Sequence, residues 1–167
     1  MIPEKEFCNW LCGIIDGDGF FEYRANEKRR AFTNGKEYFF REVICSVGIS
    51  LRSDDLRTLR FIRYKTNVGN ICNKYSYNTR SKPGFTWKVS KIEDLLNTMI
   101  PIFDSGFLVT RKREEYVLWK KGVFLKHFVS NIPRNTRNEK MWNNDYFEEA
   151  VKISKEISRI KEYRLWI

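Results

Sequence analysis

The feature that most constrains the fold is an apolar segment near the N-terminus that carries no charge on either of two helical faces. Phe7, Leu11 and Ile15 recur every four residues and form the first face. The second face combines two large apolar residues with two glycines four apart: Trp10, Gly13, Ile14 and Gly17. Glycines at this spacing allow a second helix to approach closely. The segment therefore predicts a helix that is either fully buried within one domain or packed against a second helix.

The patterning after Gly19 predicts a mixture of strands and helices. Residues 20–26 and 38–50 alternate with period two, and Asn34-Gly35 between them is typical of a hairpin turn. Ser53 is expected to cap a helix over 53–64, Ser90 and Glu93 form a capping box, and Pro101 is expected to end that helix. The remaining expected elements are strands at 70–78 and 85–89, helices at 90–99, 110–128 and 145–163, and loops at 103–107 and 130–144.

The composition excludes several classes of protein. Lys and Arg number 31 against 21 Asp and Glu, and the resulting charge of +10 indicates a polyanionic partner, either nucleic acid or an anionic membrane surface. No apolar run approaches the ~18–20 residues of a membrane span. One histidine and no Cys-x-x-Cys pair exclude a zinc finger and a nuclease built on paired histidines. The four cysteines, which lie in apolar runs, are expected to be reduced and buried: Cys8, Cys12, Cys45 and Cys72.

Two carboxylates at the end of the apolar helix, Asp16 and Asp18, form the candidate chemical site. They alternate with glycines, and such a cluster can hold a hard divalent cation through carboxylate and carbonyl oxygens. A calcium-binding EF-hand loop starting at Asp16 would need an oxygen ligand at Phe20 and a glycine at Phe21, so that motif is excluded. Without further context, an aspartate pair that caps a turn is the simpler interpretation.

The full stretch Leu-Cys-Gly-Ile-Ile-Asp-Gly-Asp-Gly at 11–19 resembles the LAGLIDADG homing endonucleases, whose name is their consensus. Six of the nine residues match it, and residues 103–116 resemble a later stretch of the same family. The resemblance spans about 5–125 and implies an α+β (mixed α/β) fold. Its expected core is an αββαββα unit with a saddle-shaped antiparallel sheet. Extra C-terminal helices would complete a single domain over 1–167, with a loop and helix at about 130–167.

The resemblance also implies roles for individual residues. Asp18 stands at the position of the metal-binding carboxylate, with the Gly17 carbonyl as a second ligand, and Asp16 is expected to be structural. Lys112 stands where the family carries a basic residue beside the scissile phosphate. The implied metal is Mg²⁺, with Ca²⁺ or Mn²⁺ able to substitute in binding or in crystals. Members with one motif act as homodimers, so the resemblance implies a helix interface through Trp10, Gly13, Ile14 and Gly17.

Leu51 departs from the family pattern. Many members carry a polar residue, often glutamine, near the end of the second strand to orient water, and Leu51 occupies that position here. Ser50 or Arg52 are the alternatives for this role. Because some members bind DNA without cutting it, a catalytically silent DNA-binding relative stays an alternative.

Alternation along the strands also predicts a polar sheet face. Amides, hydroxyls and arginines of this kind read base edges in the major groove of double-stranded DNA, although a solvated sheet face would also alternate. The residues of the predicted reading face are Glu22, Arg24, Asn26, Lys28, Arg30, Ser46, Gly48, Asn70, Lys74, Ser76, Asn78, Thr86 and Lys88.

The expected function is that of a homodimeric, metal-dependent, intron-encoded endonuclease that cuts both DNA strands at a long, partly palindromic site. An RNA maturase that assists splicing of its host intron is the main alternative. Three Ala against 15 Ile and 13 Asn suggest an AT-rich genome, as in a mitochondrion or chloroplast.

Overall fold

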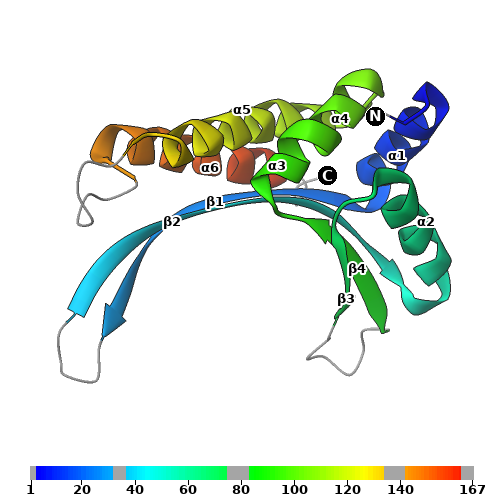
Figure 1. Ribbon diagram of the computed structural model, residues 1–167, viewed down its shortest axis with the longest axis horizontal. Helices are drawn as coiled ribbons and strands as arrows, with labels where there is room; N and C mark the ends of the chain where they lie inside the picture. The colour runs from blue at the N-terminus through cyan, green and yellow to red at the C-terminus, as the bar shows by residue number, and fades with distance from the viewer. Residues whose placement is uncertain (1–2, 32–36, 75–82, 134–141, 163–167) are drawn as a thin grey trace. The chain divides into compact units, whose positions relative to one another are not determined.

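The computed structural model of the chain describes residues 3–31, 37–74, 83–133 and 142–162, and it is an α+β fold. In Figure 1 the helices and strands follow the expected αββαββα order. Their bounds are α1 Lys5–Asp18, β1 Gly19–Ala31, β2 Glu37–Arg52, η1 Ser53–Asp55, α2 Leu56–Thr66, β3 Asn70–Lys74, β4 Gly84–Val89, α3 Ile92–Asp94, η2 Leu95–Met99, α4 Ile100–Ser105, α5 Lys112–Ser130 and α6 Asn144–Glu162.

The four strands form one open sheet in the order β1-β2-β4-β3. Residues 1–21 and 46–116 form a first compact unit, and residues 22–45 and 117–167 form a second. The expectation of a single domain over 1–167 stays a prediction. Within the described residues, no helix is both long and apolar enough to cross a membrane.

The core of the first unit lies between α1, α4 and the sheet. Phe7, Leu11 and Ile15 of α1 are buried, as the first apolar face predicted. The ring of Phe21 at the start of β1 meets Phe103 of α4 edge-on, with ring centroids 5.3 Å apart. This packing removes one face of α1 from water and fixes the helix from one side.

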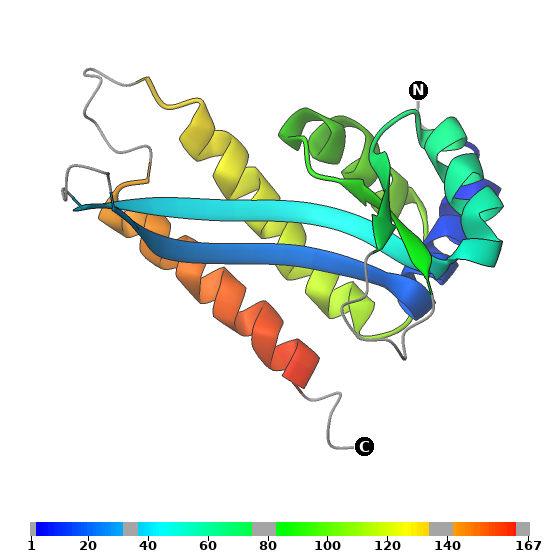
Figure 2. The same ribbon diagram turned by 90° about the horizontal axis from the view of Figure 1, so that it is seen from below.

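The register of β2, β4 and β3 explains which side chains reach that core. Ile49 on β2, Trp87 on β4 and Ile71 on β3 lie opposite one another, and Trp87 is fully buried. The Trp87 indole donates a hydrogen bond to the Val68 carbonyl at 3.0 Å. The chain turns there because Gly69 has a φ of +82°, a conformation that side chains rarely adopt. Figure 2 shows β3 and β4 beside α2.

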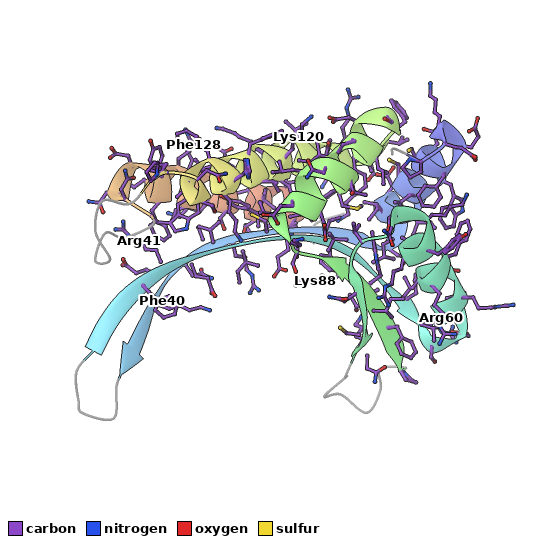
Figure 3. All side chains as sticks on the ribbon, in the orientation of Figure 1. Phe40, Arg41, Arg60, Lys88, Lys120 and Phe128 are labelled. Atoms are coloured by element: carbon purple, nitrogen blue, oxygen red, sulfur yellow. The ribbon has the colours of Figure 1, made fainter. Side chains whose placement is uncertain are left out.

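In the second unit, α5 and α6 cover one face of the β1–β2 hairpin. A Cβ at Gly122 of α5 would meet the ring of Tyr23, so the helix and the strand are in direct contact. Arg41 of β2 ties the hairpin to the start of α6. Its guanidinium, labelled in Figure 3, lies beside the helices of this unit. It donates hydrogen bonds to the Trp142 carbonyl at 3.1 Å and to Asn144 Oδ1 at 2.7 Å.

The helix starts differ from the sequence predictions at two places. Ser53 does not cap α2, because its N–H pairs with the Pro83 carbonyl at 3.1 Å and the helix begins only at Leu56. The capping box of Ser90 and Glu93 is also wrong. The strand β4 pairs through Val89, so α3 begins at Ile92 without a side-chain cap.

Pro101 does not end a helix, and residues 103–105 are helical rather than loop. The segment Leu95–Met99 winds as a π-helix, and α4 follows it directly with Pro101 in its first turn. A proline is tolerated at that position because its missing N–H would have no partner within α4. The predicted hairpin turn at Asn34-Gly35 lies outside the described residues.

Gly122→Ala tests the contact between α5 and Tyr23. The added methyl overlaps the Tyr23 ring, and overpacking of this kind costs about 1–3 kcal/mol. We expect the free energy of unfolding in urea to fall by that amount. Val117→Ala on the same helix is the control, because Val117 is exposed and its truncation leaves the Tyr23 contact intact. Equal stability of Gly122→Ala and wild type would contradict the contact.

Candidate active site

The predicted metal carboxylate lies at the C-terminal end of α1. Asp18 is the last residue of the helix, and both Asp18 and Gly17 are exposed. Asp18 makes no hydrogen bond or ion pair with any residue in the described part of the chain. The last carbonyls of a helix lack intrahelical partners, so oxygen atoms of two kinds are open to solvent at this point.

The described residues of one chain do not contain a complete metal site. Among the residues that the structure describes, no group of three or more His, Cys, Asp or Glu could hold a metal ion. The donors present at the end of α1 are oxygens only, which suits a hard cation such as Mg²⁺. The set is incomplete unless a second copy or a ligand adds oxygens.

Asp16 has the structural part expected of it. Its carboxylate accepts hydrogen bonds from the Val109 N–H at 2.8 Å, the Thr110 N–H at 3.2 Å and the Thr110 hydroxyl at 2.8 Å. The Thr110 hydroxyl in turn accepts a hydrogen bond from the Lys112 N–H at 3.2 Å, so Thr110 caps the start of α5. Asp16 therefore connects the end of α1 to the start of α5, and both of its carboxylate oxygens take part in that connection.

The prediction that Lys112 stands beside a phosphate is not supported by its position. Lys112 is 2% exposed, and its ammonium lies 3.1 Å from the Glu115 carboxylate, which is fully buried. A buried charge persists only when it is paired, so the pair belongs to the core at the start of α5. The neighbouring Arg111 and Arg113 are exposed instead.

The second face of α1 is bare in a single chain. Trp10 is 40% exposed, and a Cβ at Gly13 or Gly17 would meet no atom within 4 Å outside the local backbone of α1. Ile14 is half-buried. The alternative of a helix buried on both sides within one domain is therefore wrong for the part of the chain that the structure describes.

Phe61 of α2 extends this apolar surface and was missed in the sequence analysis. It is 44% exposed, and its ring packs edge-on against Trp10 with centroids 5.5 Å apart. The helical pattern contained the signal, because Leu59 and Ile62 define the buried face of α2 and Phe61 falls outside it.

The polar face of the sheet has the predicted parity. Gly48, Lys88 and Asn70 form one row across β2, β4 and β3, opposite to the row with the buried Trp87. Thr86 shares a 2.8 Å hydrogen bond with Ser50 on the same face. Within the first unit, Asn70 and Lys74 of this face are exposed, and Thr86 and Lys88 are half-buried. In the second unit, the predicted reading residues Arg24, Asn26 and Lys28 are exposed and Glu22 is half-buried.

Ser46 and Gly48 have the right parity but are buried, so the expectation that they are open to a ligand is wrong. The Phe20 ring and the Trp87 carbonyl cover Gly48, where a Cβ would meet them at 2.7 and 2.5 Å. Ser76, Asn78 and the side chain of Arg30 lie outside the described residues.

Leu51 lies on the core side of β2, opposite Phe85, and is half-buried. The alternatives for its role both face the polar side but are engaged: Ser50 with Thr86, and Arg52 in a 3.2 Å ion pair with Asp54. Leu51 is apolar, and the polar groups of Ser50 and Arg52 are already bonded within the chain. None of the three therefore offers an unengaged polar group to orient water.

The cysteines take no part in this site. Burial raises the pKa of Cys12 and of Cys45 to about 12, so both stay protonated and inert at neutral pH. Cys8 is also buried, as expected. The prediction that all four thiols are buried is wrong for Cys72. This residue is exposed on β3, because its side chain lies on the polar face of the sheet beside Thr86.

Together these features define the class of protein. It is an α+β protein in which one helix has an exposed apolar face and ends in an exposed carboxylate, and in which one face of the sheet is polar. The model of the LAGLIDADG endonuclease family matches residues 11–123. The chain therefore belongs to the LAGLIDADG endonuclease family.

Relatives of known sequence and structure agree with this assignment. The probable intron-encoded endonuclease Cox1-I1b of Schizosaccharomyces pombe is 29% identical over 96% of this chain, which spans 36% of that protein. The structure of I-SmaMI bound to uncleaved DNA with calcium ions has a TM-score of 0.68 and 22% identity. The match covers 91% of this chain and 45% of I-SmaMI. The homing endonuclease I-TnaI has a TM-score of 0.66 and 14% identity, with 98% and 99% of the two chains covered.

Lys112→Met distinguishes a core ion pair from a residue that contacts DNA. The change leaves Glu115 buried and without its ammonium partner, which costs about 3–5 kcal/mol. We expect that loss in urea unfolding monitored by circular dichroism. Arg113→Met, an exposed change one residue along α5, should alter stability by less than about 0.5 kcal/mol. A Lys112→Met protein of wild-type stability that fails to cut DNA would show that Lys112 acts on the substrate.

Proposed function

We propose that this chain is a metal-dependent, site-specific endonuclease that cuts both strands of DNA as a homodimer. The observation that carries the proposal is the position of Asp18. Its carboxylate is exposed and unpaired within the described residues, and it ends a helix whose outer face is bare. Two such helices packed face to face would bring two Asp18 side chains together.

The donor set fits a hard divalent cation. Asp18 would supply a carboxylate oxygen and Gly17 its carbonyl, and two subunits would double the set to the oxygen-rich coordination that Mg²⁺ requires. Ca²⁺ or Mn²⁺ could occupy the same oxygens. A Mg²⁺ bound there would stabilise the attacking and leaving oxygens of phosphodiester hydrolysis.

The polar sheet face is the proposed DNA-reading surface. Arg24, Asn26, Asn70 and Lys74 are exposed and carry the donors and acceptors that read base edges in the major groove. The net charge of +10 supplies long-range attraction to DNA. Two subunits related by a two-fold axis would read a partly palindromic site.

The bare face of α1 supports the homodimer. Trp10, Gly13, Ile14 and Gly17 form an apolar strip with two positions where a helix backbone can approach closely. Phe61 extends the strip from α2. Because the chain spans 45% of I-SmaMI, two copies together approach the length of that chain.

An RNA maturase that assists its host intron is the second candidate. The buried position of Lys112 favours it, because a basic residue beside the phosphate is needed for cleavage and not for RNA binding. The name of the S. pombe relative describes an intron-encoded protein, and we extend an intron and organellar origin to this chain as part of the proposal.

Asp18→Asn tests the metal site. The amide keeps the shape but removes one negative charge per subunit, so Mg²⁺ should bind more weakly and the cleavage rate should fall by at least about 100-fold. DNA affinity should stay equal or rise, because repulsion from the phosphates is relieved. Cleavage and fluorescence anisotropy on the same duplex measure both effects. Asp55→Asn, another exposed carboxylate in the first unit, should leave cleavage unchanged. Near-normal cutting by Asp18→Asn would remove Asp18 from the mechanism.

Gly17→Leu tests the dimer. A Cβ at Gly17 meets no atom within 4 Å outside the backbone of its own helix, so α1 itself accommodates the change, but the leucine would hold a second α1 away and cost about 1–3 kcal/mol or more per contact. We expect size-exclusion chromatography with light scattering to give a dimer for wild type and a monomer for the variant. Asn97→Leu, which adds the same side chain at an exposed position of η2, should stay dimeric. A monomeric wild type would contradict the homodimer.

A further inference from the structure

A basic trough of about 790 Å³ lies in the first unit between α2, the edge strand β3 and the connection from β4 to α3. Four cations line it: Arg60 and Arg63 from α2, Lys88 from β4, and Lys91 just before α3. Asp94 is the sole acidic residue among its lining residues. The trough therefore carries a local charge of +4 − 1 = +3, in a concave surface that concentrates the field on an anion.

Three of the four cations are available to a ligand. Arg60, Arg63 and Lys91 are exposed and form no ion pair with any described residue. Arg60 and Arg63 are three residues apart on α2, so they are neighbours on the helix surface. Arginines on a helix surface are often paired with carboxylates. Because Arg60 and Arg63 form no such pair with the described residues, their guanidinium groups can bind phosphate.

The trough is continuous with the polar sheet face. Asn70 and Lys88 line the trough, and they also stand opposite each other in the row that crosses β3 and β4 on that face. Figure 3 labels Arg60 on α2 and Lys88 on β4, which mark two walls of the trough. A nucleic acid on the polar face would reach the trough around the edge strand without leaving the protein surface.

We infer that this trough binds the sugar-phosphate backbone of the duplex that the polar face reads, through Arg60, Arg63 and Lys91. The inference rests on the proposed function and extends it to a surface outside the strands. Continuity with the polar face favours the same duplex over a separate RNA. Because phosphate contacts position a protein without reading sequence, these residues set affinity and register rather than specificity.

The test compares two double variants of the full chain. Arg60→Ala with Arg63→Ala removes two cations from the trough. Arg57→Ala with Lys65→Ala removes two cations that lie on the same helix and do not line it. The probes are a duplex selected by the wild-type protein from a random library, an unrelated duplex of equal length, and a transcript of the host intron. Binding is measured by anisotropy in Ca²⁺ over a range of KCl concentrations.

The trough variant should bind both duplexes more weakly by the same factor. Its preference for the selected duplex over the unrelated one should therefore be unchanged. Its log–log salt slope should be less steep by about 0.9 per lost contact, or about 3.6 for two contacts in each of two subunits. In the control variant the salt slope should change by less than a quarter of the change expected for the trough variant.

Two results would overturn the inference: equal losses in both variants, or a loss of affinity for the transcript with unchanged DNA binding. Failure of the proposed function is distinguishable, because wild type would then either select no duplex or leave its selected duplex uncut in Mg²⁺.

Discussion

The structure of the site depends on how α1 is held. One face of the helix is anchored by Phe7, Leu11 and Ile15 in the core, and its end is tied to the start of α5 by the three hydrogen bonds that Asp16 accepts. Since these contacts lie on one side, Gly13, Gly17 and the terminal Asp18 stay exposed among the described residues, and Trp10 on the other face contacts only the rings of Phe7 and Phe61 among the aromatic side chains. The two aspartates of the motif thus have different roles. Asp16 is hydrogen-bonded to its own chain, and Asp18 is exposed to a ligand.

The sheet likewise has one side that packs in the core and one side that is open to a ligand. The pairing of β2, β4 and β3 places Ile49, Trp87 and Ile71 on the core side and the row with Asn70 and Lys88 on the open side. Burial of the first row stabilises the fold and at the same time holds the polar row in register.

Periodicity and motif predicted the parts of the site that depend on local sequence. The apolar second face of α1 and the parity of Asn70 and Lys88 follow from residue spacing, whereas the structural role of Asp16 followed from the resemblance to the family motif. The exposure of Ser46 and Gly48 was misjudged because strand alternation does not show which residues from elsewhere in the chain cover them, such as Phe20 over Gly48. The pairing of Lys112 with Glu115 is local, three residues apart on α5, but the burial of that pair depends on the packing of the whole unit. A π-helical turn at Leu95–Met99 likewise leaves no signature in the apolar pattern.

The central claim is that two chains share one DNA target, each bringing one Asp18. Native mass spectrometry of the Asp18→Asn protein on its selected duplex tests it most directly, since the uncut complex can be weighed whole. The account predicts two 20.1 kDa chains per duplex and no stable complex with one. A single chain on the duplex, together with double-strand cutting by wild type at the same stoichiometry, would contradict it.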